Sequence, residues 1–178
     1  MTRVLVAAVA AILVGSLPTR RLAAALARVA RAEWVAAAGI AIDVLKGLAA
    51  VGWIAPAGPW SQCLVATAVL AGHQWPPLAE QTGHRGTAVA LGALTIITPI
   101  AAPLWGVFWG LGFVASGYAT LGYVAGALLL APALGFIAGW PIAAMALPLC
   151  VLLLERLRSP LREVLRGTAL KHHWRGEA

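Results

Sequence analysis

Two charged residues lie in an apolar segment where water cannot solvate them. Asp43 and Lys46 occur in the sequence A-I-D-V-L-K-G, inside a hydrophobic run from about Trp34 to Ile54. Residues three apart share one face of a helix, so the two side chains can pair. A charge at the centre of a membrane helix costs roughly 2.5–3.5 kcal/mol on insertion scales. The pair therefore predicts either an ion pair that holds helices together or side chains that line or support a polar substrate site.

A histidine and a glycine-containing loop follow these charges. His73 lies in A-G-H-Q-W-P-P, where the prolines are expected to end a helix. Its imidazole can exchange a proton near neutral pH, although a histidine at a membrane interface can also be a plain interfacial residue. The loop T-G-H-R-G-T contains Gly83, Arg85 and Gly86 and opens onto a helix. Backbone N–H groups, a helix N-terminus and an arginine together favour a bound anion such as phosphate.

The elements that must position these residues are membrane helices. The chain is 61% hydrophobic and only 11% charged, whereas a soluble domain carries about 25% charged residues. From Gly86 to Leu154 there is no Asp, Glu, Lys or Arg. Such a stretch is typical of consecutive spans of about 20 residues each, which must be helical in hydrocarbon. The sequence predicts an all-α, polytopic membrane bundle and excludes a water-soluble fold.

About seven transmembrane helices fit this chain. Three apolar runs come first: Val4–Leu17, about Trp34–Ile54 and about Cys63–Leu78. Four short spans fit the uncharged block, with breaks at Pro99–Pro103, near Ser116–Tyr118 and between Pro132 and Pro141. Five spans are the alternative, if two of them are long and kinked. No linker interrupts the chain, so we expect a single transmembrane domain over residues 1–178.

Small residues are expected to pack these helices. Glycine pairs four residues apart recur in the block, at Gly106/Gly110, Gly122/Gly126 and Gly135/Gly139. Cys63 and Cys150 show no metal or disulfide spacing and are expected to be small buried hydrophobes. His73 and His84 lack carboxylates or thiolates in a ligand pattern, so neither a metal nor another cofactor is expected.

The arginines predict the direction of the helices. The segment after the first run carries four arginines, whereas Arg3 alone precedes that run. The positive-inside rule then places the N-terminus outside and the basic tail, residues 155–178, in the cytoplasm. A signal peptide is the rival interpretation of the N-terminus, but no good cleavage site follows it. The net charge of +7 is explained by these loops and by anionic lipid headgroups, so no nucleic-acid partner is expected.

These motifs, in this order, resemble one family, the bacterial acyl-phosphate:glycerol-3-phosphate acyltransferases. G-S-L-P-T resembles the family's Gly-Ser-x-Pro, D-V-L-K-G its Asp-x-x-Lys-Gly, and G-H-Q-W-P its Gly-His-x-x-Pro. T-G-H-R-G-T-A-V is similar to its Lys-Gly-Gly-Lys-Gly-Val-Ala-Thr loop, and S-G-Y-A-T-L to its Thr-Arg-Tyr-x-Ser-Leu. The resemblance covers nearly the whole chain and includes a seven-span layout with the N-terminus outside.

Besides His84, Arg85, Val89 and Gly117, which replace a glycine, a lysine, a threonine and an arginine of these motifs, the chain departs from the family pattern in the first loop and in the tail. The family has a Gly-Ser-Gly-Asn-x-Gly-Ala-Thr-Asn loop between the first two spans, where this chain has only Arg20–Ala32. The family tail Arg-x-Asn-x-x-Arg-x-x-x-Gly-x-Glu is matched at Arg158 and Gly167. Its Asn, second Arg and Glu are replaced by Pro160, Glu163 and Ala169.

The resemblance implies acyl transfer from an acyl phosphate to glycerol 3-phosphate or a similar anion, in phospholipid synthesis at the bacterial inner membrane. It implies catalytic roles for His73 and Arg85. It implies substrate or phosphate binding by Ser16, Lys46, Gly83, Gly86 and Arg158. It implies structural support by Asp43, Gly47 and Thr120.

Two other functions stay open at this point. One is a family member with another substrate or without catalysis, acting as a non-enzymatic membrane protein. The other is a small transporter, which predicts polar residues through the depth of several spans and an inverted repeat. The polar residues lie mostly at one face of the predicted bundle, and no repeat is visible.

Overall fold

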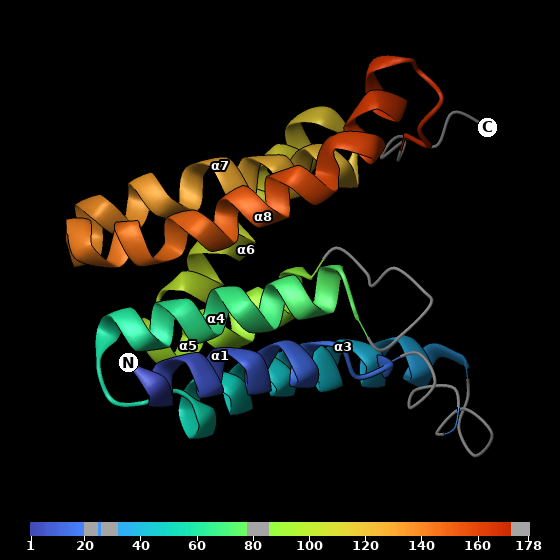
Figure 1. Cartoon of the computed structure of the whole chain (residues 1–178). Helices are drawn as coiled ribbons and strands as arrows, with labels where there is room; N and C mark the ends of the chain where they lie inside the picture. Colours follow the sequence, from blue (N-terminus) through green and yellow to red (C-terminus); the bar gives the residue numbers. More distant parts are fainter. Residues whose placement is uncertain (20–24, 26–31, 78–85, 172–178) are drawn as a thin grey trace. The chain divides into compact units, whose positions relative to one another are not determined.

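The chain folds into helices throughout the part that the computed structural model describes, residues 1–19, 25, 32–77 and 86–171. These residues form seven α-helices and one π-helical turn (Figure 1). They divide into two compact units, Met1–Pro99 and Ile100–Ala178, each described here by itself. The all-helical architecture was predicted from the sequence, whereas the single domain over residues 1–178 stays a prediction.

The first unit contains two helix pairs. α1 (Thr2–Gly15) packs against α4 (Pro59–Gln74), and α3 (Ala32–Ala49) packs against α5 (Thr87–Ile97). Figure 1 shows these four helices running side by side. α3 continues into the π-helical turn η1 (Ala50–Ile54), in which the Ala55 N–H donates to the Ala50 carbonyl at 3.0 Å.

The second unit consists of three successive helices. They are α6 (Ala101–Ser116), α7 (Ala119–Ala138) and α8 (Trp140–Leu165), and α7 packs against both of the others. Gly117 ends α6 in the left-handed conformation, with φ of 75°, where a side chain would be strained. α8 includes the first part of the predicted basic tail, whereas residues 172–178 lie outside the described part of the chain.

The positions of the helices follow the prediction, and several boundaries differ. The third predicted span, Cys63–Leu78, is wrong at both ends, because α4 runs from Pro59 to Gln74. Proline is well suited to the first turn of a helix, which explains the earlier start. The residue before Pro76 is pushed out of the helical conformation, which explains the earlier end. The last break predicted in the uncharged block lies at Gly139.

The helices differ in their capacity to cross a bilayer alone. Three of them are long and apolar enough by length and composition: Ala36–Ile54, Ala119–Ala138 and Trp140–Leu165. Thr2–Gly15, Thr87–Ile97 and Ala101–Ser116 are apolar but shorter. The four helices expected in the uncharged block are present, and the number of membrane crossings stays a prediction.

Glycines set the closest approach of the helices in the first unit. A Cβ atom at Gly72 would lie 2.8 Å from the Cα of Ile12, and one at Gly15 would lie 2.8 Å from the backbone nitrogen of His73. The α3–α5 pair repeats this arrangement, since a Cβ at Gly47 would lie 2.6 Å from the Ala93 nitrogen. Real Cβ atoms do not approach so closely, so both crossings require glycine.

The glycine pairs predicted in the second unit have different roles. Gly122 and Gly126 pack under tryptophans of α6, since a Cβ at Gly126 would lie 2.9 Å from the Trp105 ring. Gly139 instead ends α7, with φ of 91°. The prediction for Gly106 and Gly110 is wrong within this unit, because a Cβ at either position would meet nothing within 4 Å.

Replacing Gly72 by alanine should destabilise the protein. The added methyl group has to displace backbone atoms of α1, and such overpacking typically costs about 1–3 kcal/mol. The measurement is the midpoint of thermal unfolding of the purified protein in mild detergent. Gly106→Ala is the matched control, because it adds the same methyl group in open space. Equal unfolding midpoints for the two variants would contradict the close contact of α1 and α4 at Gly72.

Candidate functional site

The charged residues of α3 form a buried ion pair, as their spacing predicts. The Lys46 Nζ lies 3.5 Å from the Asp43 Oδ1. Only 6% of Asp43 and 5% of Lys46 is exposed. Removing two charges from water is expensive unless further polar groups surround them. The pair therefore depends on the partners that other segments supply.

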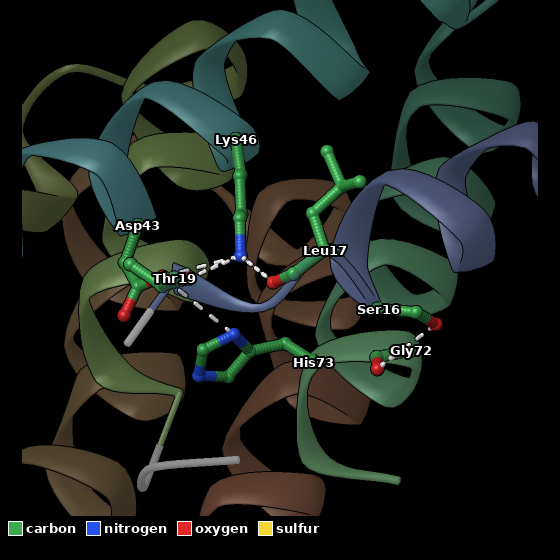
Figure 2. A network of polar contacts seen from close by, with 7 residues as sticks. All are labelled: Ser16, Leu17, Thr19, Asp43, Lys46, Gly72 and His73. Atoms are coloured by element: carbon green, nitrogen blue, oxygen red, sulfur yellow. Dashed lines mark hydrogen bonds and ion pairs between the residues drawn. The ribbon is translucent and has the colours of Figure 1, made fainter. Parts of the chain in front are cut away.

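The segment after α1 supplies those partners. The Thr19 hydroxyl donates to Asp43 Oδ1 at 2.7 Å and accepts a hydrogen bond from the Lys46 ammonium. The same ammonium donates to the Leu17 carbonyl at 2.6 Å. Figure 2 shows Lys46 directed toward Leu17 and Thr19. An ammonium has three N–H donors, and these contacts give each of them a protein partner.

His73 joins this network from the end of α4. Its Nδ1 atom lies 3.7 Å from Asp43 Oδ1, and its side chain is buried (Figure 2). A carboxylate beside Nδ1 restricts the orientation of an imidazole ring. The Nε2 atom lies on the opposite edge of the same ring. Asp43 thus connects three segments: α3, the residues after α1, and α4.

Ser16 ties the end of α1 to α4. Its hydroxyl oxygen lies 2.7 Å from the Ile12 carbonyl oxygen and 3.4 Å from that of Gly72. Ser16 is 1% exposed. In the described structure its polar contacts are therefore backbone carbonyls of α1 and α4.

The glycines at which the helices cross lie next to the polar side chains in the sequence. Ser16 follows Gly15, Lys46 precedes Gly47, and His73 follows Gly72. The missing side chains of the glycines bring the helix backbones together beside each polar residue. This closeness allows side chains from three segments to reach a single carboxylate.

The predicted anion-binding loop is described only at its end. Gly86 begins α5 in the left-handed conformation, with φ of 78°, and a Cβ there would lie 2.5 Å from the Leu70 side chain. It therefore packs against the last turns of α4, close to the buried Gln74. Gly83 and Arg85 lie outside the described residues, as do the arginines between residues 20 and 31.

Two predicted site residues belong to the second unit. Arg158 on α8 is exposed and forms an ion pair with Glu155 at 2.7 Å. Thr120 is buried in the first turn of α7. Cys63 and Cys150 are buried, as expected. Within the described residues, no three His, Cys, Asp or Glu side chains come together in a metal-binding group.

Thr19 and Gln74 were not predicted as site residues from the sequence. Thr19 belongs to the G-S-L-P-T motif, but threonine there looks like an ordinary residue between a proline and arginines. A signal did exist, because a buried Asp–Lys pair needs additional hydrogen-bond partners. Gln74, next to His73, is 0% exposed, and a glutamine in an interfacial turn carries no sign of such burial.

Comparison with known sequences identifies one family. The family model described as glycerol-3-phosphate acyltransferase matches residues 22–167. A glycerol-3-phosphate acyltransferase of Halalkalibacterium halodurans is 33% identical over 139 residues, which cover 73% of this chain and 68% of that protein. One of Rubrobacter xylanophilus is 30% identical over 152 residues, which cover 82% and 75%. One of Klebsiella pneumoniae is 39% identical over 99 residues, which cover 53% of this chain but only 47% of the relative.

The fold also has solved counterparts. The crystal structure of PlsY, an integral membrane glycerol 3-phosphate acyltransferase, in its glycerol 3-phosphate form has a TM-score of 0.77 at 20% identity, covering 96% of each chain. Its lysophosphatidic acid form has a TM-score of 0.77 at 21% identity, covering 94% of each chain. At this identity the similarity is one of fold, and it shows that the chain shares a helical fold with an integral membrane enzyme.

Removing one partner of the buried ion pair should destabilise the protein more than removing both partners. Lys46→Met leaves the Asp43 carboxylate buried without its ammonium, which typically costs about 3–5 kcal/mol. The double variant Asp43→Asn/Lys46→Met removes both charges and should unfold at a higher temperature than Lys46→Met alone. Thermal unfolding in detergent would be measured for these two variants and for Asp43→Asn alone, which completes the double-mutant cycle. Arg158→Met is the control, because an exposed pair contributes about 0–1 kcal/mol. Simple additivity of the Asp43 and Lys46 effects would show that the two charges do not interact.

Proposed function

The chain belongs to the glycerol-3-phosphate acyltransferase family, and from this membership we propose that it transfers an acyl group from an acyl phosphate to glycerol 3-phosphate. The transfer forms an ester at a glycerol hydroxyl and releases phosphate. The product is a lysophosphatidate, a precursor of phospholipids. We further propose that the chain crosses a bacterial cell membrane seven times, with its N-terminus outside and its C-terminus in the cytoplasm.

The observation that carries the proposal is the buried pair of His73 and Asp43. The 3.7 Å contact between Nδ1 and Oδ1 restricts the orientation of the ring. A base held in this way can accept a proton from a hydroxyl that lies within hydrogen-bond distance of Nε2. His73 is therefore the residue that we propose as the general base, and Asp43 as its positioning residue.

The reaction then proceeds as an ordinary acyl transfer. The glycerol hydroxyl oxygen forms a bond to the acyl carbonyl carbon while its proton passes to His73. The bond between the carbonyl carbon and the phosphate oxygen breaks, and the phosphate departs with the electron pair. The imidazolium returns its proton to the departing phosphate, which restores the starting enzyme.

Anion binding is assigned to groups close to the end of α4. Gly86 at the start of α5 packs beside Gln74, so the loop that precedes it is the proposed phosphate-binding element. In that loop Arg85 and the backbone of Gly83 would stabilise the departing phosphate. Arg158 is proposed to attract the anionic substrate to the membrane surface.

Lys46 and Ser16 are proposed to position other groups. The Lys46 ammonium already has three protein partners, so its proposed task is to hold Thr19 and Leu17 in place while it balances Asp43. The Ser16 hydroxyl contacts backbone carbonyls, so its proposed task is to fix the end of α1. Gly47 and Thr120 are proposed to support helix packing.

Replacing His73 should abolish most of the turnover. The purified chain in lipid nanodiscs would be given palmitoyl phosphate and labelled glycerol 3-phosphate, and labelled lysophosphatidate would be quantified. Loss of a general base typically lowers the rate by about 10²–10⁴-fold. His73→Gln should therefore lower kcat by a factor in this range while the KM for glycerol 3-phosphate changes little. Asp43→Asn should also lower kcat, but by a smaller factor than His73→Gln does.

The controls separate this function from its alternatives. His172→Gln alters a histidine of the C-terminal segment and should leave kcat unchanged. Glycerol in place of glycerol 3-phosphate tests whether the acceptor must be anionic. If the folded parent chain yields no product at high concentration, the proposed reaction is wrong. The chain would then be a family member with a different substrate or without catalysis.

A further inference from the structure

α8 continues as a helix beyond its apolar part and presents a row of arginines. The uncharged segment ends at Leu154, and the helix extends to Leu165. Arg158, Arg162 and Arg166 follow at intervals of four residues, and all three are exposed. Residues four apart in a helix lie on the same face, and Arg166 keeps helical backbone angles, with φ of −83° and ψ of −3°. These three residues are called the basic stripe.

The opposite face of this segment is turned inward. Leu157 is 1% exposed, and Leu161 and Val164 are partly covered. The segment is therefore held by its apolar side within the second unit. Within the second unit, the basic stripe faces away from the neighbouring helices, and its side chains are exposed.

The charge of the stripe is only partly compensated by the protein. Arg158 pairs with Glu155, at 2.7 Å. Arg162 and Arg166 have no ion pair among the described residues. Two positive groups on the outward face of one helix thus lack an anionic partner, and an anion is the complementary ligand.

Exposed leucines beside the stripe narrow the choice of anion. Leu165 lies seven residues after Arg158, hence two turns along nearly the same face, and is 78% exposed. Leu170, shortly after the helix, is 92% exposed. Arginines next to exposed leucines, at the point where a helix leaves its apolar stretch, are typical of a segment at the boundary between headgroups and acyl chains.

We propose that the basic stripe, with Leu165 and Leu170, binds anionic phospholipid headgroups of the leaflet in which the apolar part of α8 ends. Arg162 and Arg166 contact the phosphates, and the leucines enter the acyl boundary. This binding goes beyond acyl transfer and does not rest on it, because it concerns lipids as neighbours of the protein rather than as substrates. It would anchor the end of α8 and enrich anionic lipid around the second unit.

Lipid retention by the intact protein tests the proposal. The full chain in mild detergent would be mixed with equal amounts of phosphatidylglycerol and phosphatidylcholine, and the bound lipids would be counted by native mass spectrometry. We expect phosphatidylglycerol to be retained preferentially. Each basic residue near an anionic surface is worth about a fivefold change in affinity. Arg162→Gln and Arg166→Gln should each weaken phosphatidylglycerol retention by about this factor, and the double variant by about the product.

Matched variants keep the test specific. Arg162→Lys/Arg166→Lys preserves the charge and should preserve retention. Arg3→Gln removes one positive charge at the other end of the chain and should also preserve it. Leu165→Gln should weaken retention without altering charge. All variants would be checked for an unchanged unfolding midpoint in phosphatidylcholine alone, so that loss of folding is not mistaken for loss of binding.

Three results would overturn the proposal. The first is equal retention of the two lipids by the parent chain. The second is unchanged phosphatidylglycerol retention by the folded double glutamine variant. The third is displacement of phosphatidylglycerol by millimolar inorganic phosphate with no effect of Leu165→Gln, which would identify the stripe as a site for small anions. Because no turnover is measured, failure of the acyl-transfer reaction would leave this test valid.

Discussion

The first unit is organised around the cost of keeping two opposite charges away from water. Asp43 and Lys46 are both buried, so the hydrogen-bond donors of the ammonium and the acceptors of the carboxylate need partners from other parts of the protein. Thr19 and the Leu17 carbonyl meet this need only if the chain turns directly after α1. His73 reaches Asp43 only if α4 lies against α1 at the level of Gly15 and Gly72. The close helix crossings at these glycines are thus what allows the charged and polar side chains to reach one another.

The same arrangement suits a residue that must change its charge during a reaction. Asp43 and Lys46 balance each other, so a proton gained by His73 would place one additional positive charge beside a carboxylate that is already fixed. Little rearrangement is needed at that moment, which is the advantage of a preorganised site. The PlsY structures share this fold at 20–21% identity.

Features that depend on local rules could be predicted, and features that depend on contacts between distant segments could not. The seven helices follow from apolar length and from the breaks at Pro99, Gly117 and Gly139, and the Asp43–Lys46 pair follows from helical spacing. The hydroxyl of Thr19 is recruited across 24 residues, and no local pattern reveals it. Gly106 and Gly126 lie in equally spaced pairs, yet only Gly126 has a tryptophan opposite. A spacing rule shows which residues are small, but it does not show what faces them.

The π-helical turn at the end of α3 has a consequence for any alignment with a protein that has an ordinary α-helix at this place. The bond from the Ala55 N–H to the Ala50 carbonyl encloses one residue more than an α-helical turn does. A protein with an ordinary α-helix here would reach the following loop with one residue fewer, while its Asp-x-x-Lys-Gly motif kept the same orientation. A pairing of the two sequences without a gap would shift every position after Gly52 by one. Because each residue turns an α-helix by about 100°, such a shift would assign positions to the wrong face of α4.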